Sequence, residues 1–299
     1  MTVAENQAAT ALSAGQTAQA ERERPFDTII EPRRGWTGLD LPEMLRFREL
    51  LYFLVWRDVK VRYKQTVLGV AWAILQPIFN VVLFTWVFGS MAGLNKNLPP
   101  GSPPFALWIY GAQIPWQLIS TGLLQGGLSL VNAQNMISKV YFPRLFAPSA
   151  TVGGALVDMS VSVVVFALLI VAYHAHVQWT LIFVPFLLVL TIMVALGFAY
   201  LLSAMTLTYR DVKFLMPFLG TLLMYSGCIM IPAYKFHERA HLILSVNPVF
   251  GICNAWRSAI FGLPWRFEDL AISAATATLL FLVGLFYFRT TERRFADIA

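Results

Sequence analysis

Long stretches without a charged side chain constrain this chain more than any other feature. Five windows contain no Asp, Glu, Lys or Arg: residues 66–95, 97–138, 159–209, 214–234 and 271–288. A helix needs about 20 apolar residues to cross a hydrocarbon core of about 30 Å, and these windows supply that length repeatedly. Only 13% of all residues are charged, against roughly 25% in soluble domains. The sequence therefore predicts an all-α, polytopic membrane protein.

Six transmembrane helices are predicted from the apolar windows, the first of them able to kink at Pro77. They are placed at 67–91, 105–131, 149–173, 180–207, 214–231 and 270–288. A further apolar piece, "LILSVNPVFGICNAWRSAIFG", precedes the last span and is broken by Asn247-Pro248. Apolar pieces of about 10–14 residues beside spans are often interfacial or re-entrant. Two short external helices that dip into the membrane are therefore predicted within residues 232–262.

The basic residues predict the orientation. With the N-terminus inside, 17 of the 22 Lys and Arg lie in cytosolic segments, and such a bias marks the cytosolic side. Both termini are thus predicted to be cytosolic. The net charge of +6 follows this topology, so no nucleic-acid partner is predicted. Residues 1–25 are polar and read as a disordered cytosolic tail, residues 26–66 as an extended segment followed by an amphipathic helix, and residues 67–299 as the membrane domain.

The segment just before the first span combines an aromatic stripe with a basic arc. In a helix, Tyr52, Trp56, Val59 and Tyr63 share one face, and the rest of the circumference carries Arg57, Asp58, Lys60, Arg62 and Lys64. This pattern is typical of a helix that lies in the membrane interface with its basic side toward anionic groups. Periodicity alone favours a simple membrane anchor over a functional surface.

Three motifs, in this order, carry a family resemblance: "RELLYFLVWRDVKVRYKQTVLGVAWAILQP", "NMISKVYFPR" and "TYRDVKFLMP". With the six predicted spans, they resemble the membrane subunits of bacterial type-2 ABC exporters of polysaccharides, which include O-antigen, capsule and teichoic-acid exporters. The resemblance implies a homodimer bound to two copies of an ABC ATPase, in the cytoplasmic (inner) membrane. The implied substrate is a polysaccharide carried on a polyprenyl-pyrophosphate lipid.

The resemblance also implies roles for particular segments. The helix before the first span would be an interface helix, the loop 132–148 the main ATPase-coupling segment, the loop 208–214 a second contact, and 232–262 the external gate. The implied coupling residues are Asn135, Met136, Ile137, Ser138, Lys139, Tyr141, Phe142, Pro143, Arg144, Arg210 and Asp211. The interface-helix cations Arg57, Lys60, Arg62 and Lys64 would meet either the lipid pyrophosphate, which Arg can hold bidentately, or an acidic surface of the ATPase.

The chain itself carries no nucleotide-binding signature. No G-x-x-x-x-G-K-[ST] loop occurs, so ATP and Mg²⁺ are expected on the partner subunit. No catalytic residue, metal or cofactor is expected in this chain. Asp158 is the exceptional charge within the predicted spans, and an isolated acid at that depth costs about 2.5–3.5 kcal/mol. It is therefore expected to be paired, protonated or close to a watery lumen, more for a structural hydrogen bond than for substrate binding.

Aromatic side chains crowd the first two predicted spans. Flat apolar faces with polar tips suit weak, repeated contact with a passing glycan, and the candidates for lining a channel are Trp72, Phe79, Trp86, Trp108, Tyr110 and Trp116. Taken singly, each fits an interfacial belt or lipid-facing packing better. The Gly89-x-x-x-Gly93 and Gly122-x-x-x-Gly126 spacings permit close helix approach within a subunit or between two.

An alternative function comes from "HERAH", residues 237–241, which matches the H-E-x-x-H motif. On a helix His237 and His241 could hold Zn²⁺ with Glu238 as general base, as in membrane-embedded zinc metalloproteases. The motif has only three fixed positions and no clear third ligand follows. A solvated polar turn is the favoured interpretation.

Overall fold

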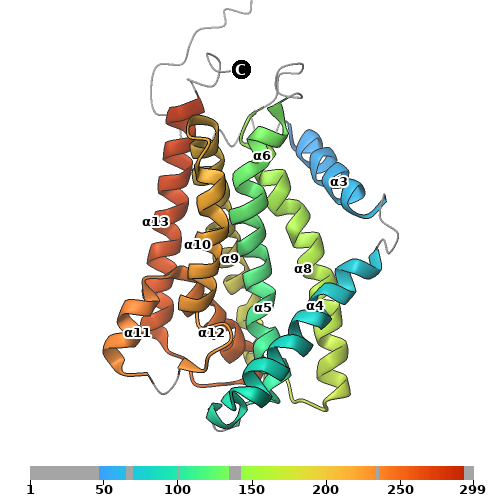
Figure 1. Ribbon diagram of the computed structural model, residues 1–299, viewed down its shortest axis with the longest axis vertical. Helices are drawn as coiled ribbons and strands as arrows, with labels where there is room; N and C mark the ends of the chain where they lie inside the picture. The colour runs from blue at the N-terminus through green and yellow to red at the C-terminus, as the bar shows by residue number, and fades with distance from the viewer. Residues whose placement is uncertain (1–46, 65–69, 100, 135–142, 234–235, 293–299) are drawn as a thin grey trace, which may run out of the picture. The chain divides into compact units, whose positions relative to one another are not determined.

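A computed structural model describes residues 47–64, 70–99, 101–134, 143–233 and 236–292, all within one compact unit. The predicted tail 1–25, the segment 26–46 and most of the coupling motif, 135–142, lie outside the described residues. Within the described ranges the chain is helical and contains no β-strand (Figure 1). The elements are α3 (Arg48–Lys64), α4 (Val70–Phe84), η1 (Thr85–Met91), η2 (Leu94–Asn97), α5 (Phe105–Thr121), η3 (Gly122–Gly126), α6 (Gly127–Asn132), α8 (Phe146–Ala172), η4 (Trp179–Phe183), α9 (Val184–Thr208), α10 (Val212–Ser226), α11 (Glu238–Ser245), α12 (Pro248–Phe261) and α13 (Phe267–Glu292).

The helices confirm the predicted class of all-α, multi-pass membrane protein. Among the described residues, four helical runs are long and apolar enough to cross a bilayer: Ile74–Met91, Phe146–Ala172, Trp179–Thr208 and Phe267–Glu292. A fifth helical run, α5–η3–α6, covers the second predicted span without a break but changes to π-helical winding at Gly122. Pro77 lies inside α4, which continues through it. The total of six spans stays a prediction.

The helix of the fifth predicted span is shorter than the sequence suggested. The predicted span reaches Ile231, but α10 ends at Ser226, and Cys228 has a left-handed φ of 50°. The Asn247 side-chain amide explains the stop, because it donates to the Leu223 carbonyl at 3.1 Å and to the Ser226 hydroxyl at 2.8 Å. A helix end buried in an apolar setting needs such partners for its last carbonyls.

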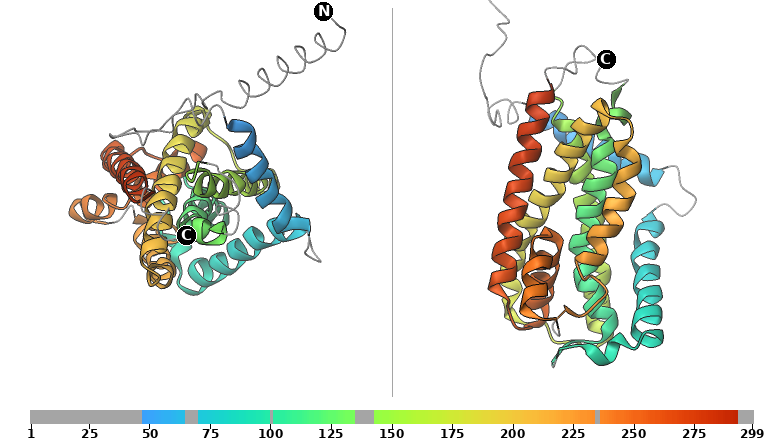
Figure 2. Two further views of the ribbon diagram at one scale, coloured as in Figure 1. Left: turned by 90° about the horizontal axis from the view of Figure 1, so that it is seen from above. Right: turned by 60° about the vertical axis from the view of Figure 1, so that its left-hand side comes forward.

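Helices that are distant in sequence come together at each of the two ends of the helix bundle. The last turns of α6, α9 and α13 share one end with α3, whereas α11 and α12 lie at the other (Figures 1 and 2). The two short helices α11 and α12 confirm the helix pair predicted within 232–262. Asn247 begins α12 by accepting the amide of Val249 at 3.0 Å, which is the ordinary geometry of an asparagine N-cap.

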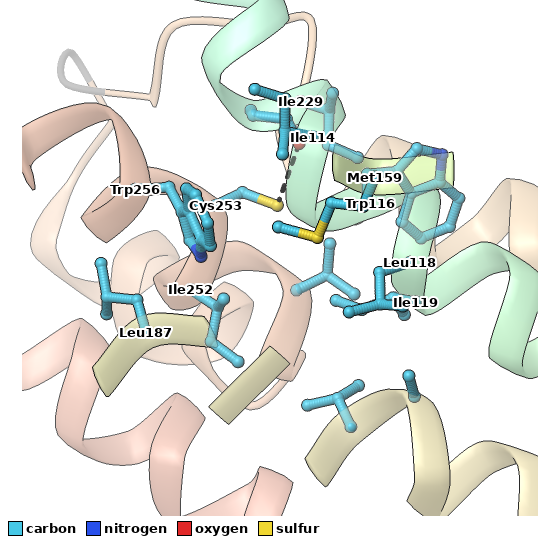
Figure 3. Close-up of a cluster of buried hydrophobic side chains, with 14 of the residues drawn as sticks. Ile114, Trp116, Leu118, Ile119, Met159, Leu187, Ile229, Ile252, Cys253 and Trp256 are labelled. Carbon is cyan, nitrogen blue, oxygen red and sulfur yellow. Dashed lines mark hydrogen bonds between the residues drawn. The ribbon is translucent and has the colours of Figure 1, made fainter. Parts of the chain in front are cut away.

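The second predicted span forms the centre of the core. Its first helix, α5, is buried along nearly its whole length and packs against α8, α9 and α12. Figure 3 shows side chains of these helices interleaved around Cys253, whose thiol lies 3.6 Å from the Ala112 carbonyl oxygen. Next to this cluster, Cβ atoms added at Gly122 and Gly126 would lie 2.5 Å and 2.6 Å from atoms of α9. This glycine pair therefore serves packing within one subunit.

Candidate functional site

The helix before the first span, α3, is seated on the first half of α8. Leu54 is 3% exposed and packs with Phe146 and Ala150 of α8. A Cβ atom at Gly153 would lie 2.6 Å from the Val55 side chain, so α3 can approach α8 this closely because position 153 is glycine. The first half of α3 thus packs on α8 through aliphatic side chains. Of the aromatic stripe, Tyr52 and Trp56 are 71% and 52% exposed, and their predicted contact with the membrane interface stays a prediction.

The last turn of α3 holds the one acidic side chain of α8. A guanidinium nitrogen of Arg62 and the phenol of Tyr63 both donate to the carboxylate of Asp158. The Arg62 and Asp158 side chains are only 24% and 17% exposed. Burial and the Asp158 carboxylate hold the pKa of Tyr63 well above its usual range, so the phenol is a neutral donor. The expectation that Asp158 would have a partner is met by two residues that lie before the first span.

The four candidate cations of α3 occupy different surroundings. Arg62 is engaged by Asp158, and Arg57 forms an ion pair with Asp58 at 2.8 Å. Lys60 and Lys64 are both exposed, and neither has an ion-pair partner among the described residues. Four residues apart, these two lysines lie on one side of the helix. Their role, and that of Arg57 and Arg62, in binding a phosphate stays a prediction.

The implied coupling residues are only partly described. Asn135, Met136, Ile137, Ser138, Lys139, Tyr141 and Phe142 lie outside the described residues. Pro143 precedes α8, and Arg144 donates to the backbone carbonyl of Glu292 at 2.7 Å, which ties this segment to the end of α13. Arg210 and Asp211 are exposed in the turn between α9 and α10. Contact of these residues with an ATPase stays a prediction.

The candidate channel aromatics fall into two groups. Trp108, Tyr110 and Trp116 are 3%, 1% and 6% exposed within one subunit. Trp72, Phe79 and Trp86, on α4 and η1, are 52%, 59% and 60% exposed. The second group therefore has free faces in a single subunit, and the first is covered by neighbouring helices. Channel lining stays a prediction for all six.

The H-E-x-x-H segment takes part in a network of polar contacts rather than in an open metal site. We call it the α11 polar network, and its members are Glu238, His241, Arg266 and Asp269. His241 is 2% exposed, and its Nδ1 and Nε2 lie 2.9 Å from the Asp269 carboxylate and 2.9 Å from the Ala233 carbonyl. Both ring nitrogens are thus occupied by protein partners, so neither is free to bind a metal in this arrangement. Glu238 pairs with Arg266 at 2.7 Å, and that guanidinium lowers the pKa of Glu238. This geometry gives the metalloprotease alternative no support.

Sequence reasoning missed a buried cation, Arg257 on α12. It is 1% exposed and stacks on the Trp108 ring at 3.4 Å from the centroid. It also donates to the carbonyl oxygens of Trp108 at 3.0 Å, Cys228 at 3.4 Å and Ile229. Cation–π contact and several carbonyls offset the loss of water around the charge. A lone arginine inside a predicted re-entrant helix was the available signal.

Comparison with known proteins now decides the family. A family model described as "ABC-2 type transporter" matches residues 49–261, which is more than two thirds of the chain. The chain belongs to this family. The match begins within α3 and ends with α12, so the seat of α3 on α8 and the Arg257 site both lie inside the ABC-2 region.

Several curated relatives of this ABC-2 transporter cover nearly the same length. The O-antigen export system permease protein RfbA of Myxococcus xanthus is 24% identical over 259 residues, which cover 85% of this chain and 97% of the relative. RfbA of Klebsiella pneumoniae is 24% identical over 253 residues, or 84% of this chain and 95% of the relative. The polysialic acid transport protein KpsM of Escherichia coli is 24% identical over 248 residues, or 79% and 91%. The family resemblance seen in the sequence motifs is confirmed.

Proposed function

We propose that this ABC-2 chain is the channel-forming permease subunit of an ATP-driven exporter that moves a polyprenyl-pyrophosphate-linked polysaccharide across the cytoplasmic (inner) membrane. The observation that carries the proposal is the similarity to O-antigen permeases over 95–97% of their length. O-antigen is the favoured cargo for that reason. Capsule, suggested by the polysialic acid relative, and teichoic acid are the alternatives.

In the proposed complex, two copies of this chain enclose the channel and two ABC ATPase subunits bind the end that carries α3. ATP and Mg²⁺ bind to the ATPase, and this chain holds no cofactor of its own. Exposure of Arg210 and Asp211 in the turn that precedes α10 supports a docking surface there. Both chain termini then face the cytosol, in agreement with the excess of Lys and Arg in those segments.

The lipid-linked end of the cargo has candidate contacts on α3. Lys60 and Lys64 are exposed on one side of the helix, whereas Arg62 is already held by Asp158. Each lysine near an anionic surface contributes about 1 kcal/mol to binding. We assign the pyrophosphate contact first to these lysines. For the glycan itself, the exposed rings of Trp72, Phe79 and Trp86 offer apolar faces to a passage between two copies.

The test is complementation of a deletion strain, with chemical identification of the lipid-linked glycan by mass spectrometry. Deletion should trap a polyprenyl-pyrophosphate glycan inside the cell, and the wild-type gene should restore surface glycan. Arg210→Glu should restore little export, because reversal of this charge disturbs the proposed ATPase contact. Lys96→Glu, a matched reversal in η2 near the opposite end, should restore export fully. Normal glycan export in the deletion strain would contradict the proposal.

A further inference from the structure

Asp158 of α8 is the residue through which α3 is tied to the helices in the interior of the fold. It is the one Asp, Glu, Lys or Arg among the 27 residues of α8, and its carboxylate receives hydrogen bonds from Arg62 and Tyr63. These donors lie 96 and 95 positions away in the chain. One turn earlier on α8, a Cβ at Gly154 would lie 3.4 Å from the Arg62 guanidinium, at ordinary van der Waals distance. The guanidinium of Arg62 therefore lies against the backbone of α8 at Gly154 as well as against the Asp158 carboxylate.

Polar contacts continue from Asp158 into α5. One turn further along α8, the Ser162 hydroxyl donates to the Gln117 side-chain oxygen at 2.7 Å and lies 3.2 Å from the Asp158 carbonyl. The Tyr110 hydroxyl donates to the Ser162 carbonyl at 3.2 Å. Ser162 and Tyr110 are 1% exposed each. Three helices, α3, α8 and α5, are therefore joined by directional contacts within otherwise apolar packing.

The same contacts reach the short helix α12. The Tyr110 ring stacks on Phe166 of α8 at 5.2 Å, and Phe166 meets Phe261 of α12 edge-on at 6.1 Å. Two residues before Tyr110 on α5, the Trp108 ring stacks against the Arg257 guanidinium of α12. A displacement of α8 or α5 would therefore shift the side chains that contact α12. Tightly packed side chains and buried polar contacts do not deform continuously but change between discrete arrangements.

We propose that Asp158 is a positioning residue for transport, through which α3 sets the position of α8 and, by way of Ser162, of α5. The proposal rests on the proposed function, in which an ATPase moves α3. When α3 moves, the Arg62–Asp158 pair must either break or carry α8 with it. Breaking leaves an unpaired carboxylate in an apolar helix, which is strongly unfavourable. The helices α3 and α8 therefore move as one body.

The first experiment measures whether α3 and α8 move together. Spin labels at Phe53→Cys and Val164→Cys report their separation in the reconstituted complex with its ATPase, with and without ATP. Both positions are exposed, at 63% and 60%, and the native Cys228 and Cys253 are buried. The label separation should stay unchanged on ATP binding in the otherwise wild-type chain. A separation that changes with ATP overturns the proposal without any variant of Asp158.

The second experiment measures glycan exported per ATP hydrolysed. Asp158→Asn should lower this ratio about tenfold, within the range by which residues on coupling networks act, while ATP hydrolysis continues. The swapped pair Arg62→Asp with Asp158→Arg should recover most of the ratio, which a merely structural loss would not predict. Asp58→Asn is the matched control, because its partner Arg57 is the adjacent residue of the same helix.

The outcomes separate the two proposals. If the wild-type complex neither hydrolyses ATP nor exports a glycan, the proposed function fails, whatever the variants do. If the wild type exports and Asp158→Asn keeps the wild-type ratio, the positioning role fails and the proposed function stands. If Asp158→Asn cannot be purified, Tyr63→Phe, which removes a single donor, should lower the ratio by a smaller factor. An unchanged ratio in Tyr63→Phe then counts against the proposal.

Discussion

Replacement of Gly122 by alanine tests the seam between η3 and α9. The new Cβ would lie 2.5 Å from the carbonyl oxygen of Ala195 and 2.9 Å from its C and Cα atoms. These are backbone atoms of α9, which cannot rotate aside, so the helices must separate. Overpacking costs about 1–3 kcal/mol, and a clash with backbone atoms belongs in the upper part of that range, about 2–3 kcal/mol. The helix preference of alanine returns about 1 kcal/mol. We expect a net loss of about 1–2 kcal/mol.

Gly220→Ala is the matched control, because the nearest atom to its Cβ is the Leu123 Cδ2 at an ordinary 3.9 Å. It lies inside α10, where alanine should leave stability unchanged or raise it by up to about 1 kcal/mol. Thermal unfolding in detergent can be followed with a thiol-reactive dye, since Cys228 and Cys253 are 3% and 0% exposed. Gly122→Ala should lower Tm by about 2–6 °C. An unchanged Tm with reduced dimer recovery would refute the argument and place this glycine between subunits.

Two further predictions concern the α11 polar network. His241→Ala removes the side chain that contacts the buried Asp269 carboxylate and the Ala233 carbonyl. This loss should destabilise the protein by about 1–3 kcal/mol, measured by the same unfolding assay. His237→Ala should have little effect, and equal losses in both would contradict the argument. Arg266 lowers the pKa of Glu238, so the stability from this exposed pair is complete above the usual glutamate pKa of about 4.3 and disappears as pH falls through the lowered value. Arg266→Gln should remove this acid dependence of Tm, and a pH profile equal to that of the wild type would count against it.

Much of the fold could be predicted because apolar length and charge placement act locally. The uncharged windows give helices at the expected places, and Asn247-Pro248 separates α11 from α12 as predicted. The end of α10 could not be predicted. It depends on Asn247 and on Arg257, which donate to the carbonyls of Leu223 and Ile229, 24 and 28 positions earlier in the chain. No local pattern contains that information.

The face of α3 shows a second limit. Residues 50–56 are apolar all round, so periodicity identifies an aromatic stripe and an aliphatic stripe equally well. The shape of α8 determines which of the two stripes packs against it, because the absence of a side chain at Gly153 leaves room for Val55. The partner of Asp158 could be predicted in kind but not in identity. Burial of an acid demands a donor, and which donor arrives depends on how two helices cross.

Charged contacts therefore determine more of this fold than their small number suggests. Within a bilayer, lipid is as apolar as a leucine side chain, so apolar surface alone does not select one helix crossing over another. Asp158 accepts from α3 only in one register, and Arg257 reaches the carbonyls of α5 and of the segment after α10 only in one position of α12. These two sites lie toward opposite ends of α5, with Ser162 and Tyr110 between them. A change in either contact must alter the same central helix, which makes α5 the natural link between the two ends of the molecule.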